Sequence, residues 1–127
     1  MRNSKLALLG VAVFAMTLAT GCAKPPQVEI DAVKASLAGI EGDAAKYSAD
    51  AWNKAQQAVN AVNAEVEAQA NKFALFRSYT KTKELITAAN QAITEAKDAA
   101  AAAKEAAKTA ANEALAAAKT ALDAAST

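Results

Sequence analysis

The side chain with the most distinctive chemistry in this sequence is the thiol of Cys22, the only cysteine of the chain. It follows three small residues, Ala19, Thr20 and Gly21. A single cysteine has no partner for an internal disulfide, so in an oxidising compartment this thiol would stay free unless it is modified. We therefore expect Cys22 to be a modified residue rather than a catalytic one.

The rest of the chain offers little for catalysis. Histidine, the usual general base and the commonest metal ligand, is absent. Asp, Glu, Lys and Ser are plentiful, but no Gly-rich phosphate loop, metal-ligand spacing or nucleophile motif surrounds them. We predict no enzymatic activity and no catalytic, cofactor-binding or metal-binding residues.

The segment before Cys22 has the layout of an export signal. Two basic residues, Arg2 and Lys5, precede an apolar run over residues 6–18, and small residues follow. This run of about 13 residues is shorter than the ~20 that a permanent membrane-spanning helix needs. The sequence therefore predicts a cleaved signal peptide over residues 1–21.

The stretch Leu18-Ala19-Thr20-Gly21-Cys22 resembles the lipobox of bacterial lipoproteins. Gly21 and Cys22 match its last two positions, whereas the usual leucine three places before the cysteine is Ala19. The resemblance implies cleavage between Gly21 and Cys22, a diacylglycerol on the thiol, and a further acyl chain such as palmitate on the new amine. Two or more such chains anchor a protein stably in a membrane. Ala23, in place of a retention aspartate, favours the inner leaflet of the outer membrane, facing the periplasm.

Composition indicates helices and argues against a nucleic-acid partner. The chain is 54% hydrophobic but only 5% aromatic, because alanine, the best helix former, makes up about a third of it. Of the 14 basic residues, Arg2 and Lys5 lie in the signal, which leaves 12 against 13 acidic residues and a net charge of about −1. No basic excess remains to neutralise phosphates, so we expect no nucleic-acid binding.

The mature chain is predicted to be all-α and to begin with a tether. Residues 22–27 contain two prolines, which prevent a helix and favour an extended spacer. A short first helix is expected over residues 28–41, with Gly42 as its end. Its apolar seam, at steps of three and four, consists of Ile30, Val33, Leu37 and Ile40.

Two further helices are expected to fold back on each other about Asn71. The second is predicted over residues 49–70, with Ser48 as its N-cap, and the third begins near Phe73. Phe73 and Phe76 are interpreted as core residues that seal the turn, with an aromatic binding patch as the alternative. The seam of the second helix is Trp52, Ala55, Val59, Val62 and Val66, and that of the third is Leu75, Tyr79, Thr82, Ile86 and Ile93.

The C-terminal part of the third helix is almost pure Ala, Lys, Glu and Thr. Its apolar seam continues into Lys97 and Lys104, so burial in the bundle is expected to end near Ala96. This divides the mature chain into a helical bundle over residues 28–96 and an extension over residues 97–127. The extension either projects as a single helix or packs through its alanine face, as in a coiled coil.

Two family resemblances concern the mature part. Cys22-Ala-Lys-Pro-Pro, with Tyr47-Ser before Ala51-Trp, resembles an uncharacterised family of Ala-rich helical bacterial lipoproteins, a domain of unknown function. The alanine helix is more distantly similar to murein lipoproteins. Those can end in a lysine bonded to peptidoglycan, whereas the last residues here are Ser126 and Thr127, so any contact with peptidoglycan is expected to be non-covalent.

Two functions follow as hypotheses. The first is a membrane-anchored, periplasm-facing lipoprotein with a structural, spacer or protein-interaction role. Its partner would be an envelope protein, peptidoglycan or a second copy of the chain. The alternative is a stress-protective helical envelope protein that works through a largely solvated helix.

Overall fold

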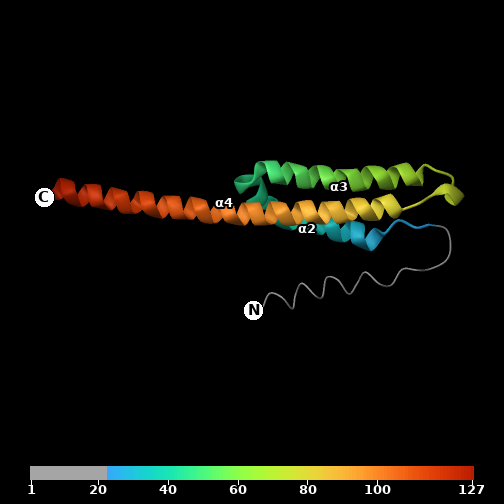
Figure 1. Ribbon diagram of the computed structural model, residues 1–127, viewed down its shortest axis with the longest axis horizontal. Coiled ribbons are helices and arrows are strands. Elements are labelled where there is room, and N and C mark those ends of the chain that lie inside the picture. The colour runs from blue at the N-terminus through green and yellow to red at the C-terminus, as the bar shows by residue number, and fades with distance from the viewer. Residues whose placement is uncertain (1–22) are drawn as a thin grey trace, which may run out of the picture.

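The computed structural model describes residues 23–127, and this part of the chain is all-α, as predicted (Figure 1). Its elements are α2 (Gln27–Tyr47), α3 (Ala49–Ala70), the short 3-10 helix η2 (Ala74–Phe76) and α4 (Thr80–Ser126). The predicted signal peptide and Cys22 lie outside the described residues. Within residues 23–127, no helix combines the length and the hydropathy that crossing a bilayer requires.

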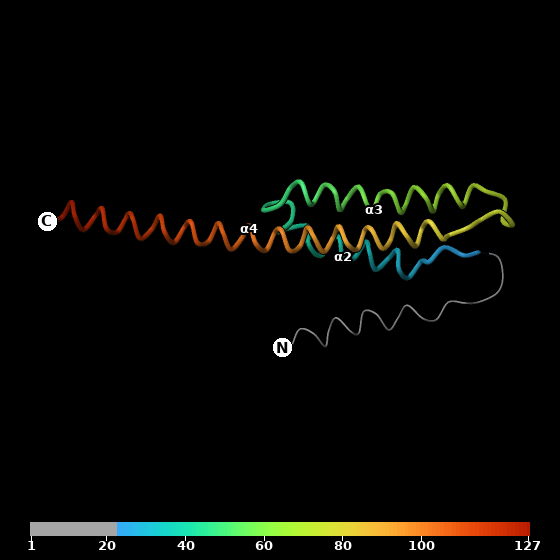
Figure 2. The backbone as a smooth tube through the Cα atoms, viewed as in Figure 1, coloured from blue at the N-terminus to red at the C-terminus, as the bar shows by residue number. Residues whose placement is uncertain are grey.

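The three α-helices form a bundle from which the last one projects. The backbone trace in Figure 2 shows α2 and α4 running in the same direction, with α3 antiparallel to both. The first half of α4 packs on both other helices, and its second half continues alone beyond the bundle. With 47 residues, α4 is about 70 Å long at 1.5 Å per residue.

The bundle core consists of the apolar seams that the sequence predicts. One seam from each helix meets the other two, because residues three and four apart lie on one helical face. Leu37, Ile40 and Val66 are half-buried at the margin of this core. The buried residues of the core are Ile30, Val33, Ala44, Trp52, Ala55, Val59, Val62, Ile86, Ala89, Ile93, Ala96 and Ala100.

Burial along α4 extends one turn further than predicted. Ala100 is only 2% exposed, although the seam was expected to end near Ala96. From Ile93 the helix places Ala96 and then Ala100 on the buried face, so Lys97 lies outside the seam and remains exposed. The lysine therefore does not have to be buried for packing to continue.

The prediction that Gly42 ends the first helix is wrong. Helix α2 continues to Tyr47, because its last turn buries Ala44 completely and packs Tyr47 against the core. That packing offsets the roughly 1 kcal/mol by which a glycine disfavours a helix relative to alanine. The following helix has the predicted bounds, and Ser48 occupies its N-cap position, but the Ser48 side chain makes no capping hydrogen bond.

The prediction for the turn after α3 is also wrong. Helix α4 begins at Thr80, not near Phe73, and η2 occupies the connection. Phe73, Leu75 and Phe76 are 69%, 79% and 75% exposed, so none of them belongs to the core. The core begins at Tyr79 and Thr82, which are buried as expected. The apolar residues of the turn therefore lie outside the bundle core, exposed to solvent.

Candidate functional site

The described chain begins at Ala23, one residue after the predicted lipidation and cleavage site, so Gly21 and Cys22 have no described position. The non-helical segment from Ala23 to Pro26 leads directly into α2. Its two prolines are half-buried, and the carbonyl of Pro26 accepts a hydrogen bond of 3.0 Å from the backbone N–H of Ile30. The predicted tether is therefore short, with Gln27 already part of the helix.

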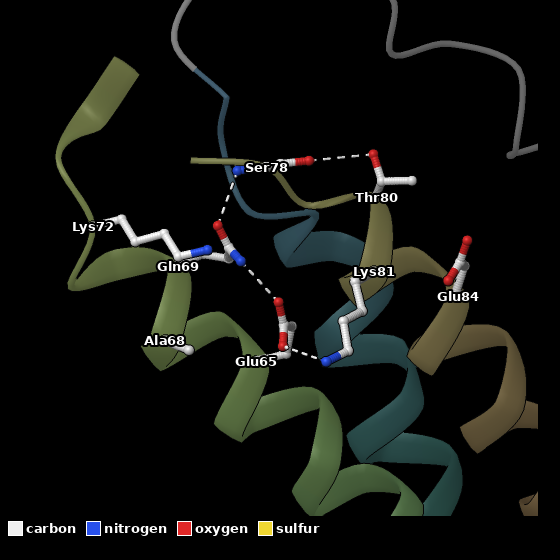
Figure 3. Close-up of a pocket in the computed structure, with 8 residues that line it drawn as sticks. All are labelled: Glu65, Ala68, Gln69, Lys72, Ser78, Thr80, Lys81 and Glu84. Atoms are coloured by element: carbon white, nitrogen blue, oxygen red, sulfur yellow. Dashed lines mark hydrogen bonds and ion pairs between the residues drawn. The ribbon is translucent and has the colours of Figure 1, made fainter. Parts of the chain in front are cut away.

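The tether enters the bundle at the same end as the α3–α4 turn (Figure 1). A polar pocket of about 540 Å³ lies in this turn, and Figure 3 shows its lining residues. They come from the last two turns of α3, from Lys72 and Ser78 in the connection, and from the first turns of α4. Gln69, only 6% exposed, is at its centre.

Gln69 joins the two sides of the turn. Its Nε2 donates a hydrogen bond of 2.8 Å to Glu65 Oε1, and its Oε1 accepts one of 3.0 Å from the backbone N–H of Ser78. The second carboxylate oxygen of Glu65 lies 3.4 Å from Lys81 Nζ on α4. The buried amide thus has partners for both of its ends, as buried polar groups require.

This network lowers the pKa of Glu65. The hydrogen bond from Gln69 has the largest effect, burial opposes it, and the charge of Lys81 lowers the pKa further. A carboxylate held in its ionised form is a weak general base at neutral pH, because efficient proton transfer needs a pKa near the working pH. The pocket is therefore better suited to holding α3 and α4 together than to catalysis.

Arg77 holds the other side of the same turn. Its Nε donates to the carbonyl of Lys72 at 2.9 Å, and one of its terminal nitrogens donates to the carbonyl of Ala70, also at 2.9 Å. These carbonyls lie at the C-terminal end of α3, where helical partners run out and a cation interacts favourably with the helix dipole. Arg77 therefore satisfies the carbonyl of Ala70, the last residue of α3, without a glycine cap.

The tip of the turn presents the three apolar residues that were expected in the core. We call Phe73, Leu75 and Phe76 the apolar tip. The rings of Phe73 and Phe76 lie 6.4 Å apart at 49°, so they contact each other rather than the bundle. The hydrophobicity of these residues suggested burial. The basic residues around them, such as Lys72 and Arg77, are a sequence signal that could have indicated exposure.

A smaller groove of about 380 Å³ lies at the opposite end of the bundle, between α2 and α4. Gly39 and Gly42 line one wall, and Ala100 and Ala101 line the other. Beside it, Lys104 forms an ion pair with Asp43. The Lys46 and Lys104 ammonium groups lie 5.1 and 6.0 Å from the centre of the Tyr47 ring, within the range of cation–π contacts.

Beyond this groove, α4 is exposed at every position. All residues from 104 to 127 are solvent-exposed, including Leu115 at 61% and Leu122 at 69%. We call residues 105–127 the arm. The described residues contain no group of three or more Asp, Glu, Cys or His side chains that could hold a metal ion.

No protein-family profile matches this chain, and neither the curated proteins nor the solved structures contain a match.

Proposed function

We propose that this chain is a lipid-anchored protein of the bacterial envelope with a structural, spacer or protein-interaction role and no catalytic activity. Acyl chains on Cys22 would anchor it in the inner leaflet of the outer membrane. The bundle would face the periplasm, and the arm would reach a partner there. The anchor rests on the resemblance of residues 18–22 to a lipobox. The observation that supports the interaction role is the arm, an exposed helix continuous with a packed bundle.

The arm has an apolar stripe in line with the buried face of the bundle. At 100° per residue, the stripe residues share the face on which Ala89, Ile93 and Ala100 pack against α2 and α3. Thr109 and Thr120 lie on the opposite face. We call the following residues the arm stripe: Ala107, Ala111, Leu115, Ala118 and Leu122.

The chemistry of the arm stripe fits a helical partner. Alanines let two helix axes approach to the short end of the usual ~8–10 Å separation, and the two leucines supply apolar area to bury. A polar or charged face would be the norm for a helix that contacts only water. An envelope protein, a second copy of the chain or non-covalently bound peptidoglycan would be the candidate partners, and a helix fits the stripe best.

The anchor is tested by the substitution Cys22→Ser. Metabolic labelling with palmitate is expected to mark the wild-type chain and not the variant, and the variant is expected to leave the outer-membrane fraction. Ala23→Ser is the matched control, since it changes the next residue and keeps the thiol. A wild-type chain that incorporates no palmitate would refute the anchor.

The role of the arm is tested by photo-crosslinking in cells. A photoreactive amino acid at Leu115 is expected to capture a discrete partner, because this position lies in the arm stripe. The same amino acid at Thr109, equally exposed but on the opposite face, is the control. Equal capture from both positions, or none from either, would contradict an interaction through the stripe.

The alternative, a stress-protective protein, is favoured by one observation, the fully exposed arm. Such a protein would gain helix on drying or in alcohol, whereas a packed bundle melts cooperatively in dilute buffer. Circular dichroism of the full chain separates the two functions. The buried core formed by α2, α3 and the first half of α4 supports cooperative melting, and therefore the first of the two functions.

A further inference from the structure

Three of the four most exposed large apolar residues of the bundle lie together in the α3–α4 turn. Phe73, Leu75 and Phe76 are each at least 69% exposed, although such residues are usually buried in a small soluble domain. They are held by a fixed base, because Arg77 binds the end of α3 and Gln69 binds the backbone of Ser78. The turn therefore presents a structured apolar tip.

The apolar tip lies in a basic segment of the chain, although Glu65 and Glu84 line the pocket behind it and Glu65 pairs with Lys81. The segment over residues 68–83 contains four basic residues and no acidic one, although the mature chain as a whole is close to neutral. The ordered combination of apolar residues and cations is typical of segments that enter an anionic membrane interface. The four basic residues are Lys72, Arg77, Lys81 and Lys83.

The position of the tip agrees with this chemistry. The described chain starts at Ala23, four residues before α2, and this start lies at the same end of the bundle as the α3–α4 turn (Figure 1). An acylated residue 22 would bring that end of the molecule to the bilayer. The arm points the opposite way, with its C-terminus at the far end of the molecule.

We propose that the apolar tip inserts into the interface of an anionic phospholipid bilayer and sets the orientation of the anchored protein. The inference rests on the proposed membrane anchoring, since the tip alone supplies only three apolar side chains. Phe73, Leu75 and Phe76 enter the boundary between headgroups and acyl chains, and Lys72 beside them faces the lipid phosphates. The bundle then stands on the membrane, and the arm extends into the periplasm.

The test places a tryptophan reporter in the full chain, bound to vesicles of phosphatidylethanolamine and phosphatidylglycerol. Both reporter variants carry the substitution Trp52→Phe, which removes the only native tryptophan. Phe76→Trp reports on the apolar tip, and Leu115→Trp, comparably exposed on the arm, is the matched control. Circular dichroism verifies that both variants remain folded.

The reporter at position 76 is expected to shift its emission to shorter wavelength on vesicles and to be quenched by lipids brominated on their acyl chains. The reporter at position 115 is expected to show neither effect. Lys72→Glu, or replacement of phosphatidylglycerol by phosphatidylcholine, should reduce the quenching at position 76. If the chain floats with the vesicles while position 76 emits as in solution, the tip does not insert and the proposal is wrong.

Failure of the anchor gives a different result. Flotation of the full chain and of Cys22→Ser with the same vesicles reports the anchor alone. Equal flotation of both chains, with quenching at position 76, would refute the anchor and support insertion of the tip. Equal quenching at positions 76 and 115 would mean that the arm lies on the membrane, which overturns the proposed orientation. Capture of a protein by the tip without quenching would assign the tip to a protein partner and also overturn the proposal.

Discussion

Lys104 Nζ lies 3.1 Å from Asp43 Oδ2, and at this ion pair α4 leaves the bundle. Both side chains are about half exposed, at 51% and 58%. An ion pair this exposed contributes at most about 1 kcal/mol, so it marks the boundary of the packed region rather than holding it together. Every later residue of α4 is exposed, which makes the arm a separate unit in energetic terms.

Removal of the arm is therefore expected to leave the bundle intact. A chain that ends at Lys104 should change the free energy of unfolding by less than about 0.5 kcal/mol, because no buried residue is lost. The circular dichroism signal of the folded protein should fall by the amount that the arm contributes. Urea denaturation followed by circular dichroism measures the free energy of unfolding.

The control for this truncation is a chain that ends at Ala92. It also loses Ile93, Ala96 and Ala100, which are buried, and should be destabilised by at least about 2 kcal/mol. If the chain that ends at Lys104 is destabilised as much as the chain that ends at Ala92, the arm packs on the bundle in solution.

The two glycines of α2 lower its stability without a packing reason. A Cβ at Gly39 or Gly42 would meet nothing within 4 Å. Gly42→Ala should therefore stabilise the protein by roughly 0.5–1 kcal/mol, because alanine loses less backbone entropy in a helix. Thermal melting of the variant measures the gain.

Ala45→Gly is the matched control, since Ala45 is an exposed residue of the same helix. It should destabilise the protein by a similar amount. A loss of stability in Gly42→Ala would mean that the groove beside Asp43 closes more tightly than it does in the structure.

The sequence predicted the core well, and for a physical reason. Helical seams such as Trp52, Ala55, Val59 and Val62 follow from the 3.6-residue period, which any amphipathic helix must obey. The all-α fold was predictable for the same reason. The predicted bounds of the second helix, residues 49–70, agree with the structure, although the Ser48 side chain makes no capping hydrogen bond.

The ends of the other helices depended on tertiary packing, which periodicity does not encode. Gly42 is a common helix terminator, but burial of Ala44 beyond it decides the outcome. Nothing in the local sequence forbids a helix from Phe73 onward. A hydrogen bond across nine residues, from the backbone N–H of Ser78 to Gln69 Oε1, holds the turn instead, and the apolar tip lies exposed between these two residues.

A buried hydroxyl near the base of this turn is unsatisfied. Thr82 is fully buried, and its Oγ1 has no hydrogen-bond partner among the described residues. Thr82→Val keeps the shape of the side chain and removes the unpaired polar group, so it should stabilise the bundle by about 1–2 kcal/mol. Urea denaturation measures the change.

Thr87→Val is the control, because Thr87 is exposed and its hydroxyl donates to the carbonyl of Lys83 at 3.1 Å. It should change stability little. A destabilised Thr82→Val variant would indicate that the hydroxyl has a partner in solution, such as a bound water.

The pH dependence of stability should report the network around Glu65. The hydrogen bond from Gln69 and then the charge of Lys81 lower its pKa in the folded state below the ordinary value of 4.5. A lowered folded-state pKa means that the ionised carboxylate stabilises the fold. This contribution is fully present above the ordinary pKa and is lost as the pH falls through the lowered one.

Glu65→Gln should therefore lower the melting temperature at neutral pH and reduce the loss of stability on acidification below pH 4.5. Glu67→Gln, two residues away on the exposed face of α3, is the control and should keep the wild-type pH profile. Melting curves from neutral pH downward measure both effects. If Glu65→Gln and wild type lose stability in parallel as the pH falls, the carboxylate does not stabilise the turn, and Gln69 must hold it through Ser78 alone.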